Sequence, residues 1–274
     1  MFAWLFPVMD RRMVWMKCKE ILQRIEEVYP ADYAMEWDNV GLLAGRYEKE
    51  VKRIYVALDA TEEVIEAAIR KGADLLVTHH PMIFAPQKKI TDAEFIGNRL
   101  IRLIRNDIAY YAMHTNYDVL RMSELSAKYL GLSGASVLEV TRDGEHKEGI
   151  GRVADLNDPL DLRACCEKVK DAFGLTHVQV FGELSGTVKR LAISPGSGKS
   201  MIGPALASGA DVLVTGDIGH HEGIDAAAQG LAVIDAGHYG IEHIFIEDMR
   251  EFLEKRLEGV SVTADPPRDP FLIV

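Results

Sequence analysis

Residues 53–81, RIYVALDATEEVIEAAIRKGADLLVTHHP, decide the fold class. The apolar runs 53–58 and 74–78 have the length and composition of buried strands. Between them, the spacing predicts a helix over residues 62–71, which Gly72 ends. A strand, a helix and a strand in this order imply a right-handed crossover and a largely parallel sheet.

The same alternation continues on both sides of this unit. We expect helices at 16–28, 92–106, 123–130 and 161–173, and strands at 108–113, 177–181, 189–193 and 232–234. Residues 138–149 contain the most polar run of the chain, and we interpret them as an exposed loop and a domain boundary. The fold class is therefore α/β, with mixed or largely parallel sheets in three layers and a metal cleft at the carboxyl ends of strands.

A partial internal repeat suggests two related α/β units. Residues 137 positions apart match in three places: Arg53 with Arg190, Gly72-Ala73-Asp74 with Gly209-Ala210-Asp211, and Thr78 with Thr215. With an offset of 124, His114 and Asp118 match His238 and Glu242. The alternative is that any two strand-helix-strand units look alike. We expect an N-terminal extension at 1–15, a metal-binding domain at 16–140 plus 225–274, and a second domain at 141–224.

Composition limits the classes of function. Hydrophobic residues make up 48% and charged residues 27%, as in an ordinary globular protein, and the formal net charge is −11. An acidic surface repels phosphate backbones, so nucleic-acid binding is disfavoured, although bound cations can reverse the field locally.

The cysteines and the N-terminus favour a cytoplasmic protein. Cys165 and Cys166 are neighbours and Cys18 is distant, so no disulfide framework or cysteine zinc site is predicted. The first apolar run is short, is interrupted by Pro7 and precedes the charges, which suits neither a signal peptide nor a membrane span.

Histidines and carboxylates follow the predicted strands. His79 and His80 come directly after the buried strand that ends at Thr78. Ligands collect beyond the carboxyl ends of parallel strands. Side chains of adjacent extended residues diverge, so the two imidazoles could serve two different ions, or one could ligate while the other supports it.

Two further pairs have the same spacing, a histidine followed four residues later by a carboxylate. His114 and Asp118 follow one strand, and His238 and Glu242 follow another. Asp118 could instead cap the next helix, but its repetition as Glu242 favours a ligand. On a helix this spacing places His238 and Glu242 on one face, one turn apart, where both can reach one ion.

Together these positions predict a two-metal site. They supply three imidazole nitrogens and two carboxylates, more ligands than one structural zinc requires. The five residues are His79, His80, Asp118, His238 and Glu242. Such a set suits two divalent ions about 3.5–4 Å apart, bridged by carboxylates and water. Zn, Mn and Fe all accept mixed nitrogen and oxygen ligands.

Two other motifs are less specific. His220 and His221 could bind substrate or transfer protons, or simply lie in an exposed polar loop. Residues 196–200, GSGKS, end like a phosphate-binding P-loop, but the required first glycine is replaced by Ile193. A small turn that could cradle an anion remains.

Five blocks of sequence resemble one known family. They are Trp37-Asp38-Asn39-Val40-Gly41-Leu42, Thr78-His79-His80-Pro81, His114 through Asp118, Thr215-Gly216-Asp217 with His220-His221, and Gly237-His238 with Glu242. In this order they resemble the Nif-three-like dinuclear metal proteins, often labelled GTP cyclohydrolase I type 2 homologues. The resemblance covers about residues 35–245.

The resemblance implies the same five metal ligands, with Asp118 and Glu242 as candidate bridging groups. It implies that His114 orients Asp118 or a water from behind, and that Trp37, Asp38 and Asn39 line the site. It also implies a ring-shaped homohexamer, in a short form without the central insert of longer members.

The expected function is hydrolysis of a small, nucleotide-like substrate through a metal-bound hydroxide. A phosphoesterase is the enzymatic alternative, because two-metal sites are common in that class. A metal-binding or adaptor protein without catalysis is the alternative from another class. DNA threaded through a ring is a third, against which the net charge argues.

Overall fold

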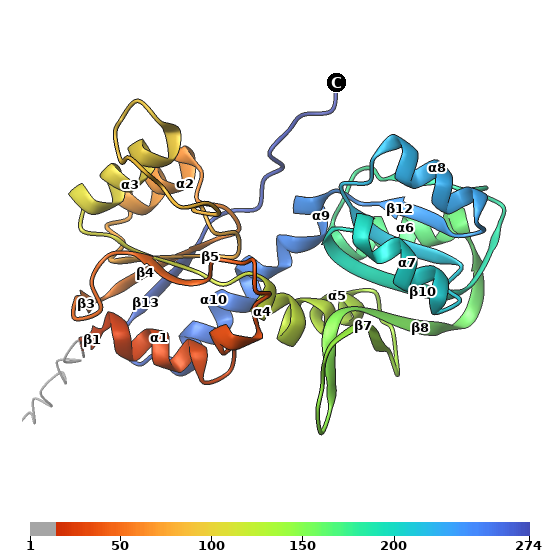
Figure 1. Ribbon diagram of the computed structural model, residues 1–274, viewed down its shortest axis with the longest axis horizontal. Helices are drawn as coiled ribbons and strands as arrows, with labels where there is room; N and C mark the ends of the chain where they lie inside the picture. The colour runs from red at the N-terminus through yellow and green to blue at the C-terminus, as the bar shows by residue number, and fades with distance from the viewer. Residues whose placement is uncertain (1–14) are drawn as a thin grey trace, which may run out of the picture.

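The computed structural model describes residues 15–274. The expected extension at 1–15 lies, except for Trp15, outside the described residues. The described chain forms two mixed β-sheets with covering helices, and the two α/β units lie side by side (Figure 1). The α/β class expected from residues 53–81 is confirmed. Across residues 15–274, no helix has both the length and the apolar character needed to cross a bilayer.

The first sheet has five strands. In spatial order they are β13 (Ser261–Ala264), β4 (Arg53–Ala57), β5 (Leu75–Thr78), β6 (Ala109–Ala112) and β2 (Gly41–Ala44). The first four are parallel, and β2 pairs antiparallel with β6. The two expected strands of the opening motif are therefore neighbours, as a crossover through one helix requires.

Helices cover both faces of this sheet, which makes it the middle of three layers. One face packs against α2 (Glu62–Arg70) and α3 (Phe95–Arg105), and the other against α1 (Cys18–Glu26) and α10 (Ile244–Arg256). Successive strand residues point to opposite faces, so Ile54 and Val56 belong to one apolar cluster and Tyr55 to the other.

The second sheet has six strands. In spatial order they are β7 (Ser136–Asp143), β8 (Lys147–Asp161), β10 (Thr187–Ser197), β11 (Val212–Gly216), β12 (Ala232–Asp235) and β9 (Gln179–Phe181). The middle strands β10, β11 and β12 are parallel. One face packs against α7 (Ile202–Ala207) and α8 (His220–Ala228), and the other against α6 (Leu162–Phe173).

The two units share the contacts expected of a repeat. In the first, one carboxylate oxygen of Asp74 accepts hydrogen bonds from the backbone N–H groups of Lys52 and Arg53, at 2.9 and 3.0 Å. In the second, Asp211 does the same for residues 189 and 190, at 2.7 and 2.8 Å. In both units the arginine Nε also donates to a carbonyl just beyond the end of the helix that follows the strand, that of Gly72 or Ser208. The offset of 137 thus relates two equivalent strand starts.

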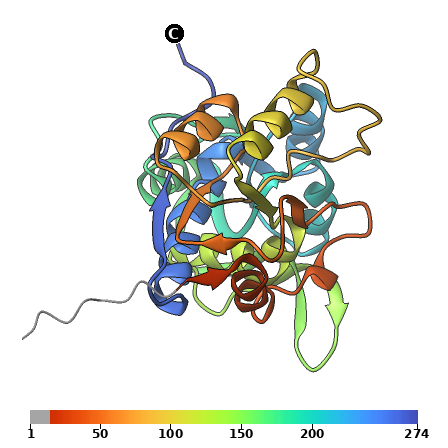
Figure 2. The same cartoon turned by 90° about the vertical axis from the view of Figure 1, so that its left-hand side faces the viewer.

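Two sequence expectations need correction. Residues 138–149 are not a loop, because β7 and β8 pair as an antiparallel hairpin that projects from the body (Figures 1 and 2). Most of this hairpin is solvated, so its strands carry charged residues and lack a buried strand's pattern. The helix expected from residue 92 begins at Phe95, and residues 81–94 are irregular.

Sheet membership also divides the chain at other points than the expected domain bounds. β12 belongs to the second sheet, although a division at residue 224 would assign it to the first. After β12, the chain returns through α10 to β13 at the edge of the first sheet. The chain therefore crosses between the units twice.

Short elements complete the fold. Between the sheets lie α4 (Thr115–Tyr117), a π-helical turn (Asp118–Met122), α5 (Ser123–Tyr129) and α9 (His238–Glu242). Elsewhere are β1 (Met16–Lys17), which pairs with β3 (Glu50–Val51), and the 3₁₀ turns Ala31–Tyr33 and Lys199–Met201. One apolar cluster runs through both units, so the strand ends of the two sheets are held at a fixed separation.

Candidate metal centre

The end of β5 presents two neighbouring imidazoles, those of His79 and His80, whose ring centroids lie 4.8 Å apart. The Thr78 hydroxyl donates to the His80 carbonyl at 2.8 Å, and the His80 N–H donates to the Leu58 carbonyl at 3.0 Å. These bonds keep the backbone extended beyond the strand. His79 is fully buried and its ring lies 5.2 Å from that of Phe245, whereas His80 lies at the edge of a cavity.

The second unit contributes His238 and Glu242 from α9. The Asp235 carboxylate at the end of β12 accepts hydrogen bonds from the N–H groups of Gly237 and Ile218, which shapes the turn into the helix. One helical turn separates the two side chains, as their spacing predicts, and His238 Nε2 lies 3.0 Å from Glu242 Oε2. Glu242 is only 3% exposed.

Asp118 follows β6 and lies inside continuous helical backbone. It closes the single turn of α4 and opens the π-helical turn, so the alternative role of an N-cap does not apply. Single π-turns are common at functional sites. Asp118 Oδ1 lies 3.4 Å from His79 Nε2.

The five predicted ligands converge in two groups that share one carboxylate. His80, His238 and Glu242 form one group, and His79, Asp118 and Glu242 form the other, each with ligand atoms within 4.8 Å of one another. Glu242 Oε2 lies 3.0 Å from His80 Nε2, and Oε1 lies 3.8 Å from His79 Nε2. The two oxygens of Glu242 thus face different groups.

Each imidazole of the cluster is held from behind through Nδ1. His80 contacts Asp59 at 2.8 Å, His238 contacts Asp217 at 2.7 Å, His114 contacts Asp38 at 3.0 Å, and His79 contacts the Met113 carbonyl at 3.0 Å. Metal-binding histidines are usually oriented in this way, with Nε2 left for the metal.

Two of these supporting carboxylates were missed in the sequence. Asp59 reads as a helix cap, and Asp217 reads as part of a polar loop. Each directly follows a parallel strand, β4 or β11, so each lies at the same sheet edge as the histidine that it contacts. Position after a strand was the available signal.

The donor atoms fit a bound cation. His79 Nε2, Asp118 Oδ1 and Glu242 Oε2 are buried and have no hydrogen-bond partner among the described residues. His80 Nε2 and His238 Nε2 lie 3.1 Å apart, although neither of two neutral rings that donate Nδ1–H to a carboxylate could donate there. Lone pairs directed at one another are satisfied by a cation between them, so the cluster is consistent with a metal site.

Without a cation, protons would take its place. Burial opposes charge on His238, but Glu242 and Asp217 raise its pKa to about 9. Burial likewise opposes charge on His79, while Asp118 and Glu242 raise its pKa well above the ordinary value. Burial favours a neutral Glu242, but the three imidazoles hold its pKa well below the usual range. The cluster therefore favours positive charge at its centre.

A cavity of about 1270 Å³ opens onto this cluster. Its lining includes four residues of the cluster, namely His80, Asp118, His238 and Glu242. The rest of the lining includes Trp37, Phe84, Phe95, Arg99 and the turn at 194–201. This volume exceeds that of a typical small-molecule pocket, about 300–1,000 Å³.

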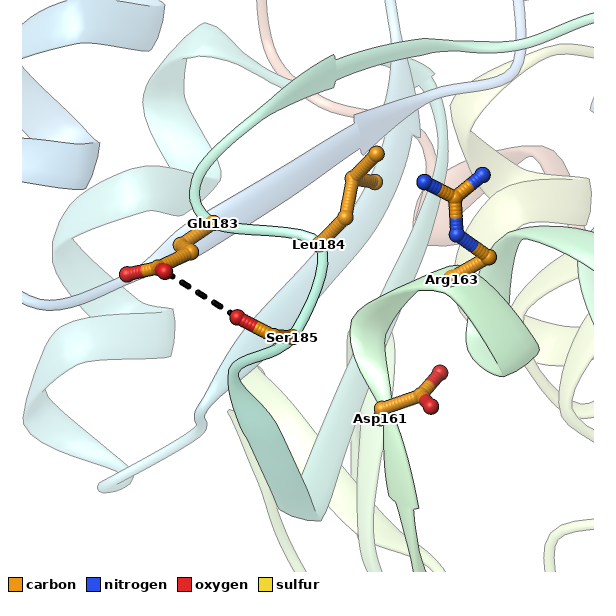
Figure 3. A pocket seen from close by; sticks show the side chains of 5 residues that line it. All are labelled: Asp161, Arg163, Glu183, Leu184 and Ser185. Carbon is orange, nitrogen blue, oxygen red and sulfur yellow. Dashed lines mark hydrogen bonds between the residues drawn. The ribbon is translucent and has the colours of Figure 1, made fainter.

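A smaller hollow of about 430 Å³ lies elsewhere in the second unit (Figure 3). It is lined by Asp161, Arg163, Glu183, Leu184 and Ser185. Its polar groups serve local structure, because Asp161 caps α6 and Glu183 accepts a hydrogen bond from Ser185. It gathers no imidazoles, so the larger cavity is the candidate site.

The remaining predicted residues fall in three places. Asp38 supports His114 and Thr115 rather than lining the cavity, and Asn39 donates to the Ile83 carbonyl at 2.6 Å. His114, expected to orient Asp118 or a water, groups with His79 and His80 as a further candidate ligand. His220 and His221 are exposed at the start of α8 and do not line the cavity of the single chain.

Gly196 gives a direct test of this geometry. Its φ is +78°, and a Cβ built there would lie 2.6 Å from Glu242 Oε1. We expect Gly196→Ala to displace Glu242 and weaken metal binding at least about tenfold, as losses around metal sites commonly do. Equilibrium dialysis against Zn²⁺ measures this metal affinity. Gly203→Ala, where a Cβ meets nothing within 4 Å, is the control, and equal metal affinity in both variants would contradict the geometry.

Comparison with known families covers nearly the whole chain. The model of the family described as Duf34/NIF3 (NGG1p interacting factor 3) matches residues 16–267. The chain belongs to the Duf34/NIF3 family. This confirms the resemblance read from the five sequence blocks.

Relatives of this Duf34/NIF3 protein match over most of their own length. It is 33% identical to a GTP cyclohydrolase 1 type 2 homolog of Clostridium perfringens, over 93% of this chain and 99% of the relative. It is 35% identical to a homolog of the same name from Streptococcus pneumoniae, over 91% and 95%.

Solved structures share the fold of this Duf34/NIF3 protein. A Bacillus cereus protein related to NIF3 superposes with a TM-score of 0.89 at 26% identity, covering 95% of this chain and 99% of that one. Reduced HcgD from Methanocaldococcus jannaschii superposes with a TM-score of 0.80 at 33% identity, covering 92% and 98%.

Proposed function

We propose that this chain is a metal-dependent hydrolase that holds two divalent ions and acts on a small, nucleotide-like molecule. The observation that carries the proposal is the shared carboxylate: Glu242 directs Oε1 and Oε2 to different groups of ligand atoms. Two groups of three ligands leave coordination positions open, as catalytic sites do and closed structural sites do not. The names of the relatives, GTP cyclohydrolase 1 type 2 homologs, support the same substrate class.

Bound ions in such a site would supply an activated water and positive charge that stabilises the transition state. The chain itself would position these components. Asp59 and Asp217 hold the rings of His80 and His238 so that Nε2 faces the centre. Trp37 and Phe84 at the cavity would exclude water and offer flat apolar faces to a ring. His220 and His221 are not part of this proposal, because neither lines the cavity.

Two other functions differ from this one in measurable ways. Phosphoester hydrolysis would use the same centre, and its product is phosphate rather than a compound with an opened ring. The family description names an interacting factor, which supports a protein that binds metal and a partner without catalysis. Such a protein would load metal and turn over neither class of substrate.

The test is turnover with defined metals. Chains loaded with Zn²⁺, Mn²⁺ or Fe²⁺ are assayed with GTP for formate release and with p-nitrophenyl phosphate for phosphate release. We expect Asp118→Ala to lower turnover at least about a hundredfold, because loss of a ligand exceeds the effect of losing a group behind it. Asp225→Ala, at an exposed site on α8, is the matched control.

The outcomes separate the candidates. Turnover that survives Asp118→Ala would contradict a metal-centred reaction. Tight binding of two ions with no turnover of either substrate would favour the non-catalytic function.

A further inference from the structure

Among the described residues that line the cavity, one arginine or lysine side chain is left without an ionic partner. Arg99, on α3, and Lys199, in the turn after β10, are the lysine and arginine side chains among its described lining residues. Lys199 Nζ is held by Glu222 Oε1 at 2.5 Å. Arg99 Nε is buried and has no hydrogen-bond partner in the described part of the chain.

A buried guanidinium nitrogen without a partner is costly, and folding alone gives no reason for it. The contrast with the next turn of the same helix is informative, because Arg102 is paired there with Glu66. Arg99 contacts instead the ring of Phe95, with its guanidinium carbon 5.2 Å from the ring centroid. An aromatic ring attracts a cation but leaves its N–H groups free to donate.

The position of Arg99 is also well defined. Two residues earlier, a Cβ on Gly97 would lie 2.2 Å from the Thr91 carbonyl oxygen. The glycine therefore lets the irregular segment 81–94 pack directly against the start of α3. This close contact fixes the helix that presents Arg99 against the segment that carries Phe84.

Apolar rings flank the same cavity. Trp37 is 65% exposed and Phe84 is 55% exposed, and their ring centroids lie 5.9 and 5.8 Å from that of His114. Large exposed aromatic side chains gathered around a cavity indicate a surface for a ligand. The described part of the lining thus combines flat apolar faces and one unpaired guanidinium in a protein of net charge −11.

We infer that Arg99 binds an anionic group, a carboxylate or a phosphate, of the small molecule that occupies this cavity, while a flat apolar part of that molecule lies against Trp37 and Phe84. The inference deepens the proposed function and rests on it, since it assigns a substrate class to the same cavity. A guanidinium suits both anions, because its paired N–H groups match their oxygens.

The test compares binding of three small probes by calorimetry. Phenyl phosphate and phenylacetate carry the two anions, and benzyl alcohol is the neutral analogue. Metal-free protein is used, so that no probe can bind through a bound metal ion. We expect Arg99→Met to weaken binding of one or both anions at least about tenfold, the effect of a lost charge-assisted hydrogen bond, and to leave benzyl alcohol unchanged.

Two variants control for charge and folding. Arg105→Met removes the same charge from an exposed position on the same helix and should bind all three probes like the wild type. Arg99→Lys keeps the charge and should retain part of the anion affinity. In a Trp4→Phe/Trp15→Phe background Trp37 is the remaining tryptophan, and quenching of its fluorescence would place the probe in the cavity.

The result also separates this inference from the proposed function. If the metal-loaded protein turns over nothing but Arg99→Met still loses the anions, the hydrolase proposal fails and the anion site stands. If Arg99→Met binds both anions like the wild type, if Arg105→Met loses as much affinity, or if the wild type binds neither anion, the anion site is overturned whatever the turnover.

Discussion

Glu242→Gln should abolish binding of the second metal ion and weaken the first at least about a hundredfold, more than the loss of a group behind a ligand costs. Its carboxylate is the one member common to the two groups that the five predicted ligands form, His80–His238–Glu242 and His79–Asp118–Glu242. The side chain is 3% exposed and lies 3.0 Å from two imidazole nitrogens, so water cannot easily replace the lost charge. The measurement is ions per chain after equilibrium dialysis against Zn²⁺.

Two further variants make this result specific. Glu242→Asp keeps the charge but shortens the side chain, so it should retain one ion and lose the other. Glu247→Gln, at an exposed carboxylate that pairs with Arg250 on α10, should retain both. Two ions bound by Glu242→Gln with the affinity of the wild type would show that this carboxylate is not shared.

The convergence of the five candidate ligands was predictable because of a general property of parallel sheets. Their strands end at a common edge, so polar residues that directly follow buried strands meet in space. His79 and His80 after β5, Asp118 after β6 and His238 after β12 follow this rule. The alternation of apolar residues in the opening motif was equally clear, since β4 and β5 are buried on both faces.

Other features depend on contacts that no local pattern encodes. Asp59 reads as a helix cap, and its contact with His80 arises because β4 and β5 are neighbours. Arg99 lies on an amphipathic helix, where an arginine normally faces solvent. The hairpin at β7 and β8 carries charges on both faces and therefore lacks the alternation of a half-buried strand. The sharing of Glu242, rather than Asp118, between the two groups depends on where α9 begins.

The metal-free protein should lose stability between about pH 6.5 and pH 9, and the metal-loaded protein should not. Burial opposes charge on His238, but Glu242 and Asp217 raise its pKa from 6.5 to about 9. A pKa raised on folding contributes stability that is fully present below the unfolded value and is lost as the pH rises through the folded value. At 1.36 kcal/mol per pKa unit, and with partial exposure of the ring, the loss is on the order of 2 kcal/mol.

Bound metal reverses this dependence. Metal competes with protons for the same imidazole nitrogens, so its stabilisation grows as the pH rises. The difference in Tm between loaded and chelator-treated protein should therefore widen from pH 6.5 to pH 9, which a series of thermal melts at fixed ionic strength would measure.

His238→Gln separates this cause from other titrations. In chelator, the variant should lose less stability over the same pH range, because the raised pKa is absent. His146→Gln, at an exposed histidine in the turn of the hairpin, should behave like the wild type. If the metal-free wild type were equally stable at pH 6.5 and pH 9, the imidazoles would not carry the positive charge that the clustered carboxylates favour, and the electrostatic basis for placing cations among them would be lost.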